Sequence, residues 1–127
     1  MDGSVLVALV ADGGEASAWA TAQVVGRSLV APHLALFEAA NVLRRQANAG
    51  RIDAAVAAMA HADLLALPVQ LWPYDPLADR SWELRHNLTA YDAAYVALAE
   101  ILGTVLVTLD RRLADAPGPR CPVHAPG

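Results

Sequence analysis

The sequence predicts an α/β protein in which a short central parallel sheet is flanked by helices on both faces. Short apolar runs alternate with segments of helical periodicity along the chain, which is the pattern of such folds. The clearest strand, Thr-Val-Leu-Val-Thr-Leu at residues 104–109, is β-branched, apolar and short, as buried parallel strands are. The chain has 127 residues and is 56% hydrophobic, so we expect a single domain over residues 1–127.

Six helices are expected from apolar periodicity and from residues typical of helix ends. Asp53 and Asp75 stand at N-cap positions, and Pro76 follows at the first position of its helix. Gly103 ends the last of the six, and Gly13-Gly14 separates the first two. The predicted helices cover residues 4–10, 15–25, 33–49, 53–67, 75–86 and 89–102.

Two further strands are expected, because short apolar runs are bounded by proline on one side or both. The first covers residues 28–30 and ends at Pro32, and the second covers residues 69–72 between Pro68 and Pro73. The Pro/Gly-rich tail at 117–127 leaves two interpretations open: one edge strand around Val123, or a loose end.

The charge pattern excludes several classes of function. The net charge is −4, which argues against a protein that coats nucleic acid through many basic contacts. All nine basic residues are arginine, so mechanisms that need a catalytic or phosphate-binding lysine are excluded. One cysteine, Cys121, cannot form an internal disulfide, and a reducing cytoplasm is the expected compartment. No apolar run approaches the ~20 residues of a membrane-spanning helix, so no membrane association is expected.

Ligands of open parallel sheets bind beyond the carboxyl ends of the strands, and acidic residues gather at such positions here. Asp110 directly follows the strand at 104–109, although it also suits the N-cap of a short helix beginning at Arg111. Asp92 stands three residues after Thr89, which is capping-box spacing. The helix that follows Asp92 is apolar nearly all round and therefore buried, so its first turn faces the interior or a cleft.

Two more carboxylates are candidates for the same site. Glu38 has apolar neighbours on both sides in its predicted helix, and a glutamate is almost never buried without a partner. The alternative is an ion pair with an arginine such as Arg45, which shares its helix face. Asp2 precedes a short apolar helix, and its alternative interpretation is a polar residue at a frayed terminus.

Four carboxylates gathered at one sheet edge would repel one another strongly. Each pair costs on the order of 4 kcal/mol at ~4 Å with an effective dielectric near 20. A divalent cation relieves this repulsion, and a set of oxygen ligands without His or Cys suits Mg²⁺ or Mn²⁺ better than zinc. Carboxylate-bound Mg²⁺ is a device for phosphate chemistry, because it can activate water and stabilise a leaving oxygen.

These acids fall in segments that resemble the four motifs of the PIN-domain nucleases. Asp2-Gly3-Ser4 with the apolar run after it resembles the first motif, and the run from Phe37-Glu38-Ala39 the second. Residues 88–99, around Thr89-Ala90-Tyr91-Asp92, are similar to the third motif and are the most specific of the four. Residues 106–113, around Asp110, resemble the fourth. The ordered set spans essentially the whole chain, and short single-domain members of this family are the VapC-type toxins.

The resemblance implies a PIN-like three-layer fold and a Mg²⁺-dependent endoribonuclease that cuts tRNA or rRNA. It also implies a homodimer and an inhibitory VapB-type antitoxin, as in type II toxin–antitoxin pairs. Carried over by position, Asp2 and Asp92 are the principal metal ligands, and Glu38 and Asp110 complete the pocket. Ser4 and Thr108 match polar positions that arrange the carboxylates. Candidates for phosphate contacts, with ordinary solvated charge as the alternative, are Arg44, Arg45, Arg111 and Arg112.

One departure from the family pattern is the single residue, Met1, that precedes Asp2, where the family has a hydrophobic strand. We therefore hypothesise a truncated or misplaced start and expect Asp2 to be weakly held.

Two other functions compete with the nuclease. A phosphatase is disfavoured because the chain lacks lysine and has Asp2-Gly3-Ser4 where many phosphatases have Asp-x-Asp. A catalytically impaired PIN-like binding module is the stronger alternative.

Overall fold

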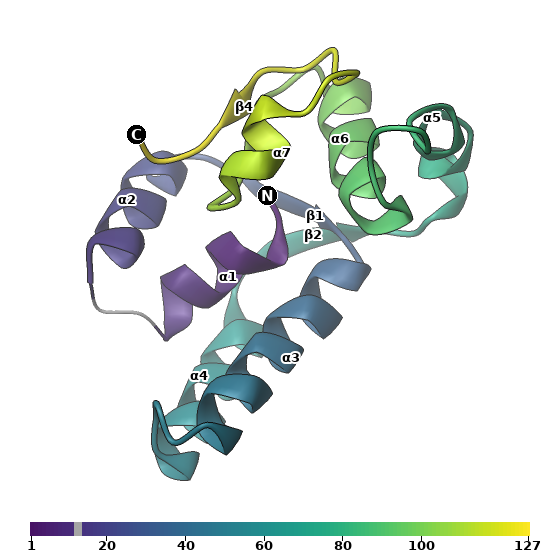
Figure 1. Cartoon of the computed structure of the whole chain (residues 1–127). Helices are drawn as coiled ribbons and strands as arrows, with labels where there is room; N and C mark the ends of the chain where they lie inside the picture. The colour runs from purple at the N-terminus through teal and green to yellow at the C-terminus, as the bar shows by residue number, and fades with distance from the viewer. Residues whose placement is uncertain (12–13) are drawn as a thin grey trace.

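The computed structural model describes residues 1–11 and 14–127, so Gly13 of the predicted helix break lies outside the described residues. Helices and short strands alternate along the chain (Figure 1). The elements are α1 Gly3–Val10, α2 Glu15–Val24, β1 Leu29–Pro32, α3 Leu34–Asn48, α4 Ala54–Ala66, β2 Val69–Trp72, the 3₁₀ turn η1 Asp75–Leu77, α5 Ala78–Glu83, α6 Ala90–Leu102, β3 Leu106–Val107, α7 Arg111–Asp115 and β4 Val123–His124.

The strands confirm the predicted α/β class and the parallel pairing. β1 pairs with β2 from Leu29↔Val69 onward, and β3 pairs with β4 through Leu106↔Val123 and its neighbours. The edge strand at Val123 is thus present. The single central sheet of the prediction is, however, divided into two separate pairs, β1-β2 and β3-β4.

The first two residues of the chain connect the two strand pairs. The Met1 ammonium group donates a 3.0 Å hydrogen bond to the Val30 carbonyl in β1. The backbone N–H of Asp2 donates to the Val107 carbonyl in β3 at 3.3 Å. A cavity of about 220 Å³ lies in the same region and is lined by Met1, Val30, Tyr95 and Val107 among others. Met1 and Asp2 therefore lie between the strand pairs β1-β2 and β3-β4.

β3 is much shorter than the predicted strand at 104–109. Gly103 ends α6 in a left-handed conformation (φ 62°), and the Thr104 N–H still donates to the helix, at the Ala99 carbonyl. At the other end, the Asp110 N–H donates to the Thr108 hydroxyl and begins the turn into α7. The two ends of the apolar run at 104–109 therefore belong to the neighbouring helices and their turns.

The predicted helix at 75–86 is also shorter in the structure. Asp75 lies inside the 3₁₀ turn η1, which the Leu77 N–H closes on the Tyr74 carbonyl at 2.7 Å, so Asp75 is not the N-cap. In the described part of the chain, Asp53 precedes α4 without a side-chain capping bond. Asp53 is therefore the N-cap of α4 as predicted, through its backbone carbonyl and not its side chain, whereas the predicted cap at Asp75 is wrong.

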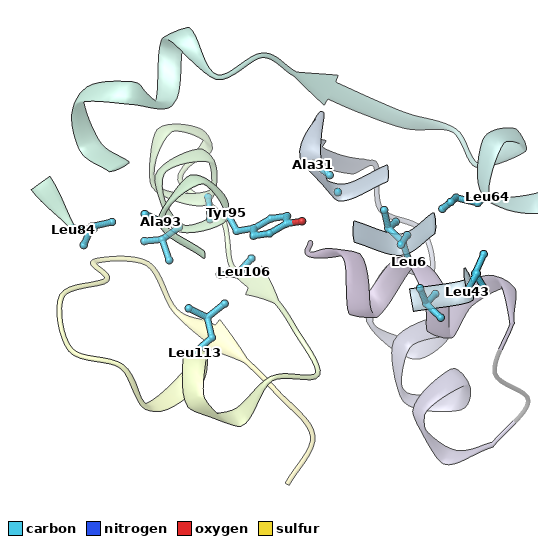
Figure 2. Close-up of a cluster of buried hydrophobic side chains, with 14 of the residues drawn as sticks. Leu6, Ala31, Leu43, Leu64, Leu84, Ala93, Tyr95, Leu106 and Leu113 are labelled. Carbon is cyan, nitrogen blue, oxygen red and sulfur yellow. The ribbon is translucent and has the colours of Figure 1, made fainter. Parts of the chain in front are cut away.

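The core is built around α6, whose residues 93–99 are all buried, as its apolar sequence predicts. Figure 2 shows Tyr95 reaching from the α6 side of the core toward Leu6 and Ala31. α3 and α4 project together away from the strands (Figure 1). Among the described residues, 1–11 and 14–127, no helix has the length and apolar character needed to cross a membrane.

α1 lies unusually close to α3 at Gly3. A Cβ atom at this position would lie 2.9 Å from Glu38 Cβ and 3.2 Å from the Ala35 carbonyl oxygen. The first clash is with a side-chain atom fixed to the α3 backbone, so the helices would have to move apart. The close approach also sets the spacing between the first residues of α1 and Glu38.

Gly3→Ala should therefore lower the free energy of unfolding by about 1–3 kcal/mol, the usual cost of overpacking. Helix propensity alone predicts the opposite sign, because alanine stabilises a helix interior by about 1 kcal/mol over glycine. Urea denaturation of the two proteins measures the difference, with Ala58→Val on the exposed face of α4 as a control for added bulk. A Gly3→Ala protein as stable as the parent would contradict the close packing.

Candidate functional site

Asp2 is held firmly, contrary to the expectation of a weakly held or frayed residue. Its side chain is 8% exposed and caps α1, where Oδ1 accepts from the Val5 N–H at 3.3 Å. Oδ1 also accepts from the Ser4 hydroxyl at 2.5 Å, and Oδ2 accepts from the Thr108 hydroxyl. Ser4 in turn accepts from the Leu109 N–H. Both predicted supporting residues, Ser4 and Thr108, therefore orient this carboxylate.

Glu38 projects from α3 and is half-buried. Its partner is Tyr95 of α6, whose hydroxyl donates to Glu38 Oε1. The Glu38 carboxylate thus binds a tyrosine where the alternative interpretation expected an arginine. Burial and this hydrogen bond together raise the pKa of Tyr95, so the phenol stays protonated and acts as a donor. Tyr95 therefore fixes the direction of the Glu38 side chain.

Asp92 and Asp110 stand in the first turns of α6 and α7, and both belong to the acidic cluster of Asp2, Glu38, Asp92 and Asp110. Thr89 caps α6 by accepting from the Asp92 N–H at 3.1 Å, as the capping-box spacing predicts. Asp110 caps α7 by accepting from the Arg112 N–H at 2.9 Å. The Arg112 guanidinium also binds Asp110, with Nη2 3.1 Å from Oδ2. A role at the start of a helix is therefore compatible with a place in the acidic cluster for both residues.

The electrostatics show that the four carboxylates interact with one another. Burial raises the pKa of Glu38, and the charges of Asp2 and Asp92 raise it further. Burial likewise raises the pKa of Asp92, with further contributions from Asp110 and Asp2. Hydrogen bonds from Arg112 lower the pKa of Asp110. The cluster thus holds two carboxylates that resist ionisation and one that is stabilised as an anion.

The donor set fits a hard divalent cation, because it consists of carboxylate and hydroxyl oxygens around mutually repelling charges. Within residues 1–11 and 14–127, no three His, Cys, Asp or Glu side chains are close enough to form a ready-made cation cage. Two of the four carboxylates are held by other groups, Glu38 by Tyr95 and Asp110 by Arg112. A cation would therefore have to compete with these contacts.

The four arginines considered as phosphate contacts are all exposed: Arg44, Arg45, Arg111 and Arg112. Arg112 lies against the acidic cluster through Asp110. Arg111, its neighbour in α7, donates to the Pro126 carbonyl at 3.0 Å. The α3 arginines are about two helical turns beyond Glu38. α7 therefore carries the basic side chains nearest to the carboxylates.

Comparison with known proteins identifies the family of the chain. A family profile described as PIN domain matches residues 1–119. The chain is 41% identical over 123 residues to VapC ribonuclease Mb0985 of Mycobacterium bovis, covering 97% of this chain and 94% of the relative. Ribonuclease VapC1 of Mycobacterium tuberculosis is 44% identical over 97 residues, 73% of this chain and 71% of the relative.

A solved structure shows the same fold. The crystal structure of PAE2754 from Pyrobaculum aerophilum superposes with a TM-score of 0.68 at 31% identity, over 96% of this chain and 79% of that chain. The fold and the acidic site thus define an α/β protein of the PIN class. The chain belongs to the PIN-domain family, and its relatives place it among the VapC-type ribonucleases.

Sequence reasoning missed Tyr95 as part of this site. Tyr95 stands three residues after Asp92 in a helix that is apolar nearly all round, so its sequence indicates a core residue. The side chain is indeed buried, but its hydroxyl reaches Glu38, 57 residues away along the chain. A buried tyrosine usually needs a hydrogen-bond partner, which is the one signal that could have linked it to Glu38.

Asp92→Asn should raise the midpoint of thermal unfolding at about pH 7. Because the folded state raises the pKa of Asp92, it binds this proton more tightly than the unfolded chain, and the ionised form opposes folding. The gain should shrink as the pH falls below the ordinary range of aspartate, where both states are protonated. Thermal unfolding followed by circular dichroism from about pH 3 to pH 8 measures the trend.

Asp110→Asn is the matched control with the opposite sign. Arg112 lowers the pKa of Asp110, so its ionised form stabilises the fold above the ordinary pKa of aspartate. This variant should unfold at a lower temperature than the parent at about pH 7. Equal shifts in the two variants would show that Asp92 is not destabilised by its neighbours.

Proposed function

We propose that this VapC-type protein is the toxin of a type II toxin–antitoxin pair and an endoribonuclease that depends on Mg²⁺ or Mn²⁺. Asp2, Glu38, Asp92 and Asp110 form its catalytic and metal-binding site. The observation that carries the proposal is the interaction of these four carboxylates, contributed by four different parts of the fold. The substrate is structured RNA, either tRNA or rRNA, and the bond that breaks is a phosphodiester.

In this proposal, Asp2 and Asp92 are the principal ligands, and Glu38 and Asp110 complete the site. A bound divalent cation supplies the charge that lowers the pKa of the attacking water and stabilises the leaving oxygen. The hydroxyls of Ser4 and Thr108 keep Asp2 oriented, and Tyr95 keeps Glu38 oriented. This support matters because a site needs its ligands within ~0.5 Å of the productive geometry.

α7 supplies the positive charge for the phosphate. Arg112 is 90% exposed, and its bond to Asp110 is a surface contact that is easily exchanged. In the reaction we expect Arg112 to leave Asp110 and bind a phosphate oxygen, and the Asp110 carboxylate would then be free to help hold a cation. An exposed arginine suits this role because its fork of donors matches phosphate geometry.

The relatives named VapC ribonuclease support three further parts of the proposal. We propose that residues 1–127 act as one domain, that the protein is a homodimer, and that a VapB-type antitoxin inhibits it. We also propose that it acts in the cytoplasm, where its RNA substrates are found.

Purified protein should cut total cellular RNA into discrete fragments with Mg²⁺ or Mn²⁺ and should be inactive in EDTA. Asp92→Asn should reduce the cleavage rate on the order of 100-fold or more, because it removes a charged ligand from the site. Asp63→Asn, an exposed aspartate in α4, is the matched control and should cut like the parent. Cleavage that persists in EDTA, or in Asp92→Asn, would contradict the proposal.

Binding of the cation should be visible without catalysis. At 100 times its Kd, Mn²⁺ should stabilise the parent by ~2.7 kcal/mol, and it should stabilise Asp92→Asn much less. Thermal unfolding with and without Mn²⁺ measures the effect, with Asp63→Asn again as the control. A parent protein with no stabilisation would favour the alternative, a PIN-like binding module whose carboxylates remain bound to their own neighbours.

A further inference from the structure

An aromatic pocket of about 370 Å³ opens between α3 and α6, the two helices that carry Glu38 and Asp92. The chain has three Trp, three Tyr and one Phe. More than half of these aromatic side chains line this pocket: Phe37, Trp72, Tyr74 and Tyr91. Pro32 and Trp72, the last residues of β1 and β2, also line it, so the pocket lies at the carboxyl ends of these strands.

The pocket adjoins the acidic cluster on both helices. Phe37 immediately precedes Glu38 in α3, and Tyr91 immediately precedes Asp92 in α6. The rings are also available for contact, since Phe37 is 76% exposed and Tyr91 is 65% exposed. Large exposed aromatic side chains beside a catalytic cluster are a costly feature unless they have a function.

We propose that this aromatic pocket binds an unstacked base of the RNA substrate, next to the phosphate that is cut. The inference rests on the proposed nuclease function and assigns a base-binding subsite to it. Unstacked RNA bases are recognised by stacking on aromatic side chains and by hydrogen bonds to their edges. Phe37 and Tyr91 supply the faces for stacking. His33 and the hydroxyl of Tyr74 are polar groups of the pocket lining for the edges of the base.

The charge of the chain favours a base-stacking contact. With a net charge of −4 and no lysine, the protein can gain little RNA affinity from general attraction to the phosphates. Stacking on an aromatic ring does not depend on net charge, because every base has a π-face. An aromatic pocket beside the carboxylates therefore supplies affinity where the electrostatics of the chain do not.

The location favours RNA over a protein partner. Because the lining residues Phe37 and Tyr91 directly precede Glu38 and Asp92, an occupant of this pocket would lie close to the two carboxylates. Other exposed apolar side chains lie away from the carboxylates, on α4, which projects from the body of the molecule (Figure 1): Val56, Met59 and Leu65.

The test measures binding of a fluorescein-labelled, random-sequence single-stranded RNA dodecamer by fluorescence anisotropy, in an Asp92→Asn background. Phe37→Ala and Tyr91→Ala should each raise the Kd about ten- to hundred-fold, the effect of losing one stacking platform. Tyr91→Phe keeps the ring and should bind like the parent. Met59→Ala, an exposed apolar residue of α4, is the control for lost apolar surface and should also leave binding unchanged.

The active protein provides the second measurement. On total cellular RNA, Phe37→Ala and Tyr91→Ala should raise KM more than they lower kcat. End mapping of the fragments should also show a weaker base preference beside the cut. Circular dichroism should show both variants folded, as expected for exposed side chains.

Three results would overturn the inference. If the parent cuts RNA and both alanine variants bind and cut as it does, the pocket is not a base subsite, although the proposed nuclease function stands. If RNA binding is unchanged but sedimentation shows that the variants lose a dimer, the pocket binds a second copy of the chain. If the parent neither binds nor cuts RNA, the nuclease function fails and this inference fails with it.

Discussion

The structure depends on one buried carboxylate at the junction of its two strand pairs. Burying an ionised group is costly unless hydrogen bonds replace its water, and Asp2 receives them from Ser4, Val5 and Thr108. These bonds join the start of α1 to the end of β3. The backbone N–H of Asp2 adds a bond to β3, and Met1 adds one to β1. Asp2, a principal ligand in the proposed chemistry, therefore also forms, together with Met1, the connection between the two strand pairs.

Small side chains allow the carboxylates to come near each other. Ala35 and Ala39 are fully buried on α3, and Gly3 packs against this face with no room for a Cβ. The short distance between α1 and α3 lets Asp2 influence the charge of Glu38. Burial first, and the neighbouring carboxylates second, raise the pKa of Glu38 and of Asp92, so their ionised forms cost free energy in the absence of a counter-charge. Tight packing elsewhere, above all along α6, offsets that cost.

The local features of the fold could be predicted from the sequence, whereas the contacts between distant residues could not. The buried α6, its Thr89 cap and the Gly103 stop follow from periodicity and end residues. The ends of β3 could not be predicted, because Thr104 and Thr108 bond to groups outside the strand. The sequence identified four acidic candidates and, through the family resemblance, Ser4 and Thr108, but not Tyr95, the partner of Glu38. Tyr95 lies 57 residues from Glu38 along the chain, in a helix whose apolar pattern indicates only a core position.

An acidic protein that cuts RNA must attract its substrate through contacts at the site, because its net charge repels the phosphates. The carboxylate cluster repels phosphate unless a counter-charge neutralises it, and Arg112 supplies part of that charge by binding Asp110. Since Arg112 is exposed, its departure would cost little, and in the proposed mechanism the same side chain binds the RNA. In the proposed base subsite, the aromatic rings of Phe37 and Tyr91 attract bases without adding charge. A net charge of −4 is therefore compatible with RNA cleavage, because the proposed RNA contacts are confined to the edge of the site.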